Sequence, residues 1–425
     1  MLSHRITRLS NRIAVLTERI PSSPSASVGV WLDIGSRDES LSNNGISHLY
    51  EHMVFKGTHK RTGLEIVRTL EEKGGQVNAY TTKEQTCFYA RVVTEEVPRA
   101  LDVLLDMVLD PIFDEEELRK EREVVIEELK GCDDNPDERV YDLFGPALFG
   151  KQSLSYPIAG TVESVEKLKR VHLKNHLKKI KTNLPVYVVV AGNVNHSEVV
   201  RLVREVSQGL LQPSEVASRN RFERLVKKTN PIHLIEQRNI QQANILMGTP
   251  SFALTDKRCM PQAILNCILG DGMSSRLFQR VREDYGYVYH INTYTETLVN
   301  GGMFNVSFSM EPAHLKKCFN VLNREFSSLK KEGITVKELE FAKANIKGAF
   351  QLEIESTHSK MNFLARSVLS GRPVKSKEQI LEQIEKVTLK QVNEVIQHLF
   401  QSQNWGSALV VPNRTKVDVG ALLSF

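Results

Sequence analysis

The chain has 425 residues, of which 41% are hydrophobic and 25% charged, and its formal net charge is +5 at pH 7. The 56 basic and 51 acidic residues are spread along the chain and form no basic stripe of the kind that binds nucleic acid, so we expect no nucleic-acid partner. No apolar run approaches the ~18 residues of a membrane-spanning helix, so we expect no membrane partner.

The N-terminal segment has none of the features of a targeting signal. It contains arginines but no apolar central region, and a strand-like run, RIAVL, begins at Arg12. The five cysteines are odd in number, scattered and without a CxxC pair, which favours reduced thiols. We therefore expect a cytoplasmic protein of bacterial type, with no signal or transit peptide.

Strand-like and helical segments alternate along both halves of the chain. The strand-like runs are SVGVWLDIGS, NAYTTKEQTCFYARVV and VYVVVAGN, followed by ANILMGTPSF, GGMFNVSFSM and SALVVPN. Long segments with helical periodicity separate them, including DEEELRKEREVVIEELK and VKELEFAKANIKGAFQLEIES. This alternation predicts an α+β fold.

The order of these elements repeats once. The run LRKEREVVIEEL in the first half matches LEFAKANIKGAF in the second, and VVAGN matches LVVPN, in pattern rather than in identity. Hydrophobic periodicity lapses in the polar stretch between the halves. We therefore predict two homologous domains, residues 1–212 and 231–425, joined by a linker over residues 213–230.

The segment GISHLYEHMVFKGTH, residues 45–59, holds two histidines and a glutamate on one predicted helix. His48 and His52 are four apart, so both can aim an imidazole nitrogen at one metal ion. Glu51 lies about 100° round the helix from His52, where it can reach a water on that metal without ligating it. This order, His-x-x-Glu-His, is the inverted zinc-protease helix. The alternative is that the histidines are polar surface groups or satisfied core groups.

A catalytic zinc site needs a third protein ligand and an open fourth position. The best donor is the acidic helix EEELRKEREVVIEELK. In it Glu121 and Glu128 lie two turns apart on one face, beside an apolar stripe, whereas Glu127 is rotated by roughly 100°. Without the histidine motif, such a segment is more typical of a solvated charged helix.

A second pair, His172 and His176, is also four apart, in VHLKNHLKK. Its neighbours are lysines and include no carboxylate, which favours a solvated helix face. In the second half, the repeat brings Ala342 and Ala349 to the positions of the two glutamates, and no His-x-x-Glu-His occurs there. Any single metal site therefore belongs to the first half.

The chain resembles the pitrilysin/insulinase family of zinc metallopeptidases, and specifically its short two-domain branch. That branch includes the catalytic beta subunit of the mitochondrial processing peptidase and its bacterial relatives. Besides the histidine segment, the resemblance rests on VGVWLDIGSRDE, GGQVNAYTTKEQTCFYARV, FDEEELRKEREVVIEELK, AGNVNH, GMSSRLFQRVREDYGYVY and FQLEIESTHSKMNFLARS, and it covers most of the chain. It implies two structurally homologous α+β domains, each a mostly antiparallel sheet covered by helices, which together form half of a clamshell.

The resemblance also implies a ligand set. The family's third zinc ligand lies 76 residues beyond the second histidine, which is Glu128 here, and a supporting glutamate seven residues earlier matches Glu121. We therefore expect one Zn²⁺ per chain, held by His48, His52 and Glu128, with Glu51 as the general base and Glu121 holding the geometry of the site.

Substrate-binding residues follow from the same resemblance. Asn78 and Ala79 match an asparagine-alanine pair on an edge strand that holds the substrate backbone. Arg282 and Tyr289 match an arginine and a tyrosine that bind substrate across from the zinc, and Tyr289 would also stabilise the developing oxyanion. Taken alone, Tyr289 is more typical of a packed strand aromatic. The chain departs from the family at Tyr50, where leucine is more usual, and this leaves the chemistry intact.

These observations predict a zinc endopeptidase that hydrolyses unfolded peptides or presequence-like segments. The family encloses its active site between two clamshell halves, and this chain supplies one of them. We therefore expect a homodimer in which Arg282 and Tyr289 of one copy face the zinc of the other. The alternative is a catalytically silent scaffold or peptide-binding homologue of the same fold.

Overall fold

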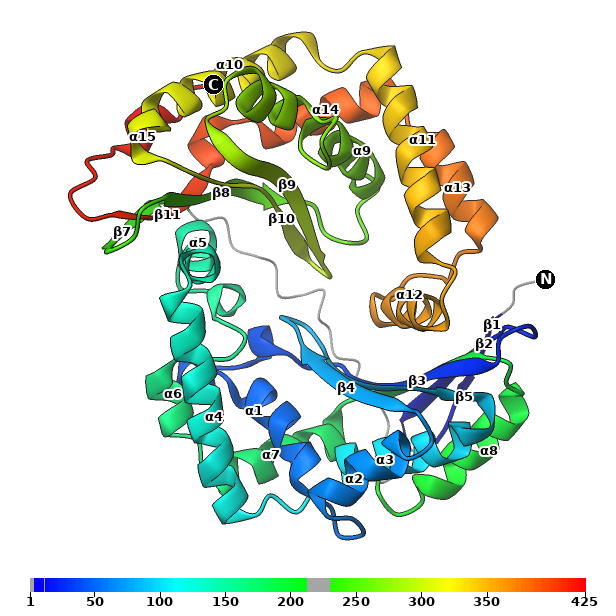
Figure 1. Cartoon of the computed structure of the whole chain (residues 1–425). Helices are drawn as coiled ribbons and strands as arrows, with labels where there is room; N and C mark the ends of the chain where they lie inside the picture. Colours follow the sequence, from blue (N-terminus) through cyan, green and yellow to red (C-terminus); the bar gives the residue numbers. More distant parts are fainter. Residues whose placement is uncertain (1–3, 11, 212–229) are drawn as a thin grey trace. The chain divides into compact units, whose positions relative to one another are not determined.

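The computed structural model describes residues 4–10, 12–211 and 230–425, which form two compact units (Figure 1). All of the predicted linker except Asn230 lies outside the described residues. Of the described residues, the first unit takes in those within Met1–Lys130, Tyr156–Arg219 and Leu352–Val374. The second takes in those within Gly131–Ser155, Asn220–Gln351 and Lys375–Phe425. Each unit therefore includes at least one segment from the other half of the sequence.

The first unit is built on a six-stranded sheet with the order β1-β2-β6-β3-β5-β4. Only β2 and β6 are parallel, and the other neighbours pair antiparallel. β4 is one edge of this sheet. The strands are β1 (His4–Arg8), β2 (Ile13–Arg19), β3 (Ser25–Leu32), β4 (Gln76–Thr81), β5 (Thr86–Val93) and β6 (Val186–Gly192).

Helices cover both faces of this sheet. A large apolar core joins one face to most of the unit's helices, and α12 (Thr357–Leu369) packs over a smaller cluster on the other face (Figure 1). The buried hydroxyls of Ser27 and Thr357, 2.9 Å apart, link β3 to α12. The remaining helices are α1 (Ile46–Met53), α2 (Gly63–Glu71), α3 (Val97–Leu109), α4 (Glu115–Asp134), α6 (Val162–Glu166), α7 (Arg170–Asn183) and α8 (His196–Val206).

The second unit repeats this plan on a five-stranded sheet with the order β7-β11-β8-β10-β9. Here β7 and β11 form the parallel pair. α5 (Pro136–Phe149) packs on one face of the sheet, and α9, α10 and α14 contribute to the core on the other (Figure 1). The other elements are β7 (His233–Arg238), β8 (Ala243–Ser251), β9 (Val288–Leu298), β10 (Gly301–Met310), β11 (Gly406–Pro412), α9 (Cys259–Leu269), α10 (Leu315–Glu332), α11 (Val336–Glu353), α13 (Lys377–Glu385), α14 (Leu389–Leu399) and α15 (Val419–Leu422).

The predicted fold class, two homologous α+β domains with mostly antiparallel sheets, is confirmed. The matched runs VVAGN and LVVPN occupy corresponding places. They form the ends of β6 and β11, and each of these strands lies fourth in its sheet, counted from β4 or β9, and belongs to a parallel pair. β1, β7 and β9 are not among the strand-like runs predicted from the sequence. All three are edge strands, and edge strands carry polar side chains that weaken the apolar signal.

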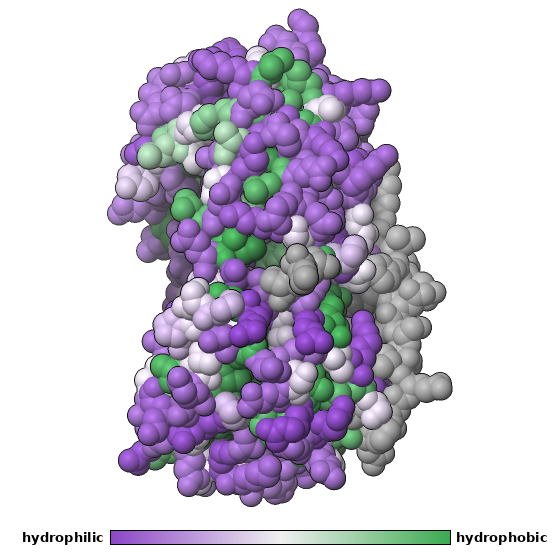
Figure 2. All heavy atoms as spheres, turned by 90° about the vertical axis from the view of Figure 1, so that its right-hand side faces the viewer, coloured by the Kyte–Doolittle hydropathy of each residue, from purple (hydrophilic) through white to green (hydrophobic). Residues whose placement is uncertain are grey.

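Hydrophilic residues cover most of the face shown in Figure 2, with hydrophobic residues scattered among them. Among the described residues, no helix is both long enough and apolar enough to cross a membrane.

In the second unit, Glu338 lies in the first turn of α11 and binds Arg276. Its carboxylate accepts hydrogen bonds from Arg276 Nε at 2.6 Å, from a second guanidinium nitrogen at 2.8 Å and from the backbone of Thr335 at 2.7 Å. Burial raises the pKa of Glu338, but these donors lower it by more, to about 2. The ionised carboxylate therefore stabilises the fold above its ordinary pKa of 4.5, and this contribution is lost as the pH falls toward 2.

Replacing Glu338 by Gln is expected to lower the free energy of unfolding by about 1–2 kcal/mol at pH 7, because charge-assisted bonds and a helix cap are lost. Urea unfolding of both proteins from pH 7 to pH 3 measures the difference, which should narrow below about pH 4.5. Glu382→Gln removes an exposed partner of Lys386 and serves as the control. A difference that stays constant down to pH 3 would contradict this account.

Candidate metal centre

α1 presents its polar residues away from the core. The carboxylate of Glu39 accepts hydrogen bonds from the backbone N–H groups of Gly45, at 2.7 Å, and Ser47, at 2.8 Å, which satisfies free donors at the N-terminus of the helix. The apolar face then packs into the core, with Ile46, Leu49, Tyr50 and Met53 buried. The histidines and Glu51 lie on the remaining surface, as helical periodicity requires.

His48, His52 and Glu128 come together in the first unit. Glu128 Oε2 lies 3.9 Å from His48 Nε2 and 3.7 Å from His52 Nε2, and the ligand atoms of the three residues all lie within 4.8 Å of one another. Glu128 reaches this position because Leu118 and Val125 bury the neighbouring stripe of α4. Within the described residues, no other group of three His, Cys, Asp or Glu side chains is arranged in this way.

This donor set fits zinc. Two imidazole nitrogens and one carboxylate make up a common set for a catalytic zinc ion, and a tetrahedral ion places its ligand atoms about 3.4 Å apart. The two distances from Glu128 exceed this separation by about 0.3 and 0.5 Å, and the ligand atoms of the two histidines lie within 4.8 Å of each other. Burial, followed by the neighbouring His52, lowers the pKa of His48 to about 4, so His48 is neutral at pH 7 and free to ligate.

Glu121 orients His52. Its Oε2 lies 3.1 Å from His52 Nδ1, which leaves His52 Nε2 directed toward Glu128, and its Oε1 lies 2.6 Å from Lys56 Nζ. Burial lowers the pKa of His52, but the hydrogen bond to Glu121 and the charges of Glu128, Glu121 and Glu51 outweigh burial and raise it. Burial raises the pKa of Glu121, and its bonds to His52 and Lys56 reverse this effect. A carboxylate bonded to the second nitrogen of a ligating histidine is typical of zinc sites.

Glu51 is half-buried beside the three candidate ligands and is not one of them. The hydroxyl of Thr81, on β4, donates a hydrogen bond to Glu51 Oε2 at 2.5 Å. Burial raises the pKa of Glu51 above its ordinary value, which moves this carboxylate toward the range suited to a general base.

The second histidine pair differs from its prediction. His176 is buried, at 7% exposed, and its ring lies 5.1 Å from the ring of Tyr50, so a solvated face is wrong for this residue. Burial, followed by Lys179, lowers the pKa of His176 to about 3 and keeps it neutral. The apolar environment arises because Tyr50 fills the core position beneath α7, and its hydroxyl donates to the carbonyl of Val108 at 2.5 Å.

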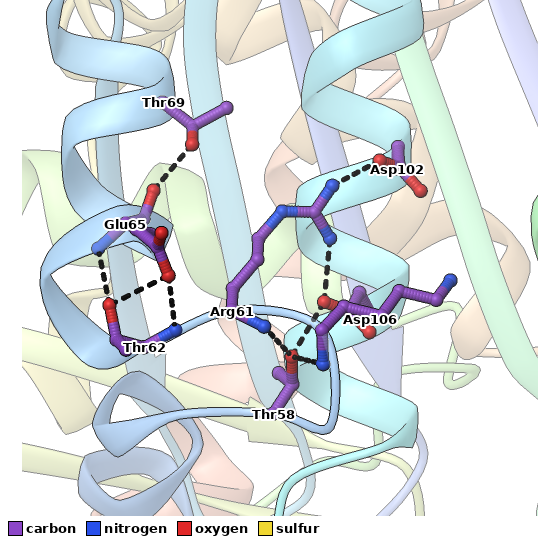
Figure 3. Close-up of polar contacts among 8 residues, drawn as sticks. Thr58, Arg61, Thr62, Glu65, Thr69, Asp102 and Asp106 are labelled. Atoms are coloured by element: carbon purple, nitrogen blue, oxygen red, sulfur yellow. Dashed lines mark hydrogen bonds and ion pairs between the residues drawn. The ribbon is translucent and has the colours of Figure 1, made fainter.

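A polar cluster joins the segment just before α2 to α3 (Figure 3). Arg61 donates to Asp106, at 2.6 Å, and also pairs with Asp102, while Thr58 donates to Asp106 at 2.8 Å. Thr58 also forms a β-bridge with Pro111, just before α4, which carries Glu121 and Glu128. These contacts hold the segment that follows α1 against α3 and against Pro111, which precedes α4.

Asn78 and Ala79 lie on the free edge of the sheet, in β4. The Ala79 N–H donates to the side-chain oxygen of Asn78 at 2.8 Å rather than to β5, so it points out of the sheet. The odd-numbered residues of β4 therefore turn their backbone groups to the free edge. An extended peptide can pair there by strand addition.

Arg282 and Tyr289 belong to the second unit. Tyr289, on β9, is 79% exposed and is therefore not a packed aromatic of the strand. The guanidinium of Arg282 lies 4.7 Å from the ring centre of Phe278 and 5.6 Å from that of Tyr289. Arg282 is carried by a π-helical segment, Phe278–Asp284, a geometry found frequently at functional sites.

Two neighbours of the candidate site, Lys56 and Thr81, were not predicted from the sequence. Lys56 follows His52 by four residues, so helical spacing could have placed it near the same carboxylate. Thr81 offered no such signal, because its contact with Glu51 depends on how β4 packs against α1.

Comparison with known protein families gives two matches. Residues 14–162 match the model described as insulinase, peptidase family M16, and residues 167–346 match the model described as the peptidase M16 inactive domain. The uncharacterized zinc protease YmxG of Bacillus subtilis is 36% identical over 403 residues, covering 95% of this chain and 97% of the relative. An uncharacterized zinc protease of Streptomyces coelicolor is 36% identical over 92% of this chain and 86% of its own length.

Solved structures share the fold. A structure from Pseudomonas fluorescens, described as a peptidase M16 inactive domain, aligns with a TM-score of 0.87 at 17% identity, over 98% of this chain and all of that one. A protease from Helicobacter pylori aligns with a TM-score of 0.87 at 20% identity, over 96% of this chain and 99% of that one.

Proposed function

The chain belongs to the insulinase family, peptidase family M16, and from this membership and the site geometry we propose that it is a zinc-dependent endopeptidase. The observation that carries the proposal is the convergence of His48, His52 and Glu128, with Glu51 beside them. One zinc ion per chain, held by the three ligand side chains, supplies Lewis acidity toward a water molecule and the scissile carbonyl.

The chain's own residues perform the proton transfers. Glu51 accepts a proton from the attacking water and delivers it to the leaving amine, as its position beside the ligands and its raised pKa allow. Glu121 keeps His52 in one tautomer and orientation, and Lys56 neutralises Glu121 from its other side. Tyr289 donates a hydrogen bond to the developing oxyanion.

The substrate in this proposal is an unfolded peptide or presequence-like segment. It binds as an added strand along β4, where the backbone of Ala79 is free to pair once the Asn78 side chain turns away. Main-chain pairing accounts for tolerance of many sequences. α4 carries Glu128 and is rich in glutamate, and the acidic character of this helix favours a basic peptide.

Activity is tested with a quenched fluorescent basic peptide of about twenty residues, together with the zinc content of the purified protein. Cleavage that stops on chelation and returns with zinc supports the endopeptidase. The competing function is a silent scaffold of the same fold, and it requires neither zinc nor cleavage. A protein that holds no stoichiometric zinc and cleaves no peptide favours the scaffold.

We also propose that the active form is a homodimer in which Arg282 and Tyr289 of one copy face the candidate ligands of the other. The exposed hydroxyl of Tyr289 and the nearby guanidinium of Arg282 can donate hydrogen bonds to a peptide carbonyl or oxyanion. Tyr289 and Arg282 also belong to a different unit from the candidate ligands. Light scattering at micromolar concentration is expected to give twice the 48.1 kDa of the chain. A monomer that retains full activity would contradict the proposal.

A further inference from the structure

Thr81 is the last residue of β4, and its hydroxyl is the partner of Glu51. Thr81 Oγ1 donates to Glu51 Oε2 at 2.5 Å, across 30 positions of sequence. Among the described residues, no other group donates a hydrogen bond to either oxygen of the Glu51 carboxylate. One oxygen is therefore held, and the other is left to receive a proton.

The position of Thr81 is set by the sheet. Thr81 pairs with Thr86 of β5, and Thr82 then turns the chain, its N–H donating to the Gln85 carbonyl at 2.8 Å. Along β4 side chains alternate between the two faces, so Val77, Ala79 and Thr81 share the face that packs toward α1. The hydroxyl that binds Glu51 is therefore positioned by a β-strand and not by a loop.

The hydrogen bond restricts a side chain that otherwise has several rotamers. A free glutamate samples three side-chain torsions, and only some rotamers place an oxygen where a water can be deprotonated. Thr81 fixes one carboxylate oxygen and with it the direction of the other. Thr81 lies in β4, the strand that carries Asn78 and Ala79. The proposed peptide-binding strand therefore also orients the carboxylate of Glu51.

We propose that Thr81 is a positioning residue for Glu51, an inference that rests on the proposed peptidase function. The Thr81 hydroxyl holds Glu51 Oε2, so that Oε1 faces the attacking water. No proton passes to Thr81 in the reaction, and it contributes no ligand to the metal.

The test compares wild type, Thr81→Val, Thr81→Ser and Thr86→Val on the basic peptide. Valine keeps the volume and the branched shape of threonine but removes the hydroxyl, and serine restores it. Thr81→Val is expected to lower kcat about 10- to 100-fold, with KM within about twofold of wild type, because a charge-assisted bond to the base is lost. Thr81→Ser is expected to recover most of kcat.

Thr86→Val is the matched control. Thr86 lies opposite Thr81 in the ladder, and its buried hydroxyl donates to the Ile34 carbonyl at 3.0 Å. This variant loses a strand hydroxyl without touching Glu51, so its kcat is expected to stay within about threefold of wild type. Zinc content and Tm, measured for each variant, separate misfolding or metal loss from misorientation of the base.

A further readout does not depend on turnover. In the Glu51→Gln background, the Kd of the uncleaved peptide is expected to be the same with threonine or valine at position 81. A Kd that rises with valine would overturn the inference, because Thr81 would then contact the substrate. Wild-type kcat in a zinc-loaded Thr81→Val protein would also overturn it while leaving the peptidase proposal intact. A zinc-loaded wild type that cleaves no peptide overturns both.

Discussion

Glu51→Gln is expected to lower kcat on the basic peptide about 10³-fold while zinc remains bound at one ion per chain. Glutamine matches the size of glutamate but cannot accept the proton that attacking water must lose, and a positioned general base contributes roughly 10²–10⁴-fold. Zinc is retained because the three ligand atoms belong to other side chains. The Thr81 hydroxyl can still donate to the glutamine oxygen, so the fold around the site is preserved.

Cleavage rate and zinc content are measured on the same preparation, because the two results together show whether Glu51 moves a proton or holds the metal. Glu123→Gln, which removes an exposed charge on α4, controls for the loss of one negative charge and should keep wild-type kcat. If Glu51→Gln loses zinc together with activity, Glu51 holds the metal site instead of moving a proton. A Glu51→Gln protein as fast as wild type would remove Glu51 from the mechanism.

The candidate site could be predicted to a large extent from the sequence because its geometry is helical. Spacings of four and seven residues place side chains on one face of a helix whatever that helix packs against, and this is how His48, His52, Glu121 and Glu128 were selected. The apolar stripe of α4 then indicated which face turns toward the protein, since Leu118 and Val125 are buried as expected. Local periodicity was sufficient for these residues.

The remaining contacts depend on tertiary packing that periodicity does not encode. The hydroxyl of Thr81 reaches Glu51 only because β4 lies against α1, and the burial of His176 depends on a tyrosine 126 positions earlier in the sequence. The exchange of α5 and α12 between the two units is a similar case. An amphipathic helix shows in sequence that it has an apolar face, but not which sheet will cover that face.

The order of the strands explains why the second half could be recognised as a homologue without a metal site. Counted from β4 in the first sheet and from β9 in the second, the parallel pair occupies the fourth and fifth places in both sheets. β9 is therefore the edge strand that corresponds to β4. At the places of Glu121 and Glu128, α11 carries Ala342 and Ala349, which can neither bind a metal nor orient a ligand. The repeat therefore preserves the architecture, and at the corresponding edge β9 carries the exposed side chain of Tyr289.

Glu128→Ala is expected to lower zinc affinity more than about 100-fold and to abolish peptide cleavage without lowering the stability of the metal-free protein. The loss of one of three ligands should lower zinc affinity by more than the 10- to 100-fold that is typical when a residue that only orients a ligand is replaced. Glu121 is a residue of the orienting kind, so the zinc affinity of Glu121→Gln should lie between those of Glu128→Ala and wild type. The side chain of Glu128 is 48% exposed, so its removal leaves no cavity in the core.

Glu127→Ala supplies the matched control, because it removes a carboxylate from the adjacent position of the same helix. Glu127 is 71% exposed and pairs with Lys130 at 2.7 Å, and its direction on the helix is rotated by about 100° from that of Glu128. Competition with a fluorescent zinc chelator gives the affinities, and thermal unfolding of the metal-free proteins gives the stabilities. Equal zinc affinities for the two alanine variants would mean that the acidic helix attracts the metal only through its overall charge. A loss confined to Glu128→Ala requires a direct bond from that one carboxylate, because the two variants change the charge of the helix equally.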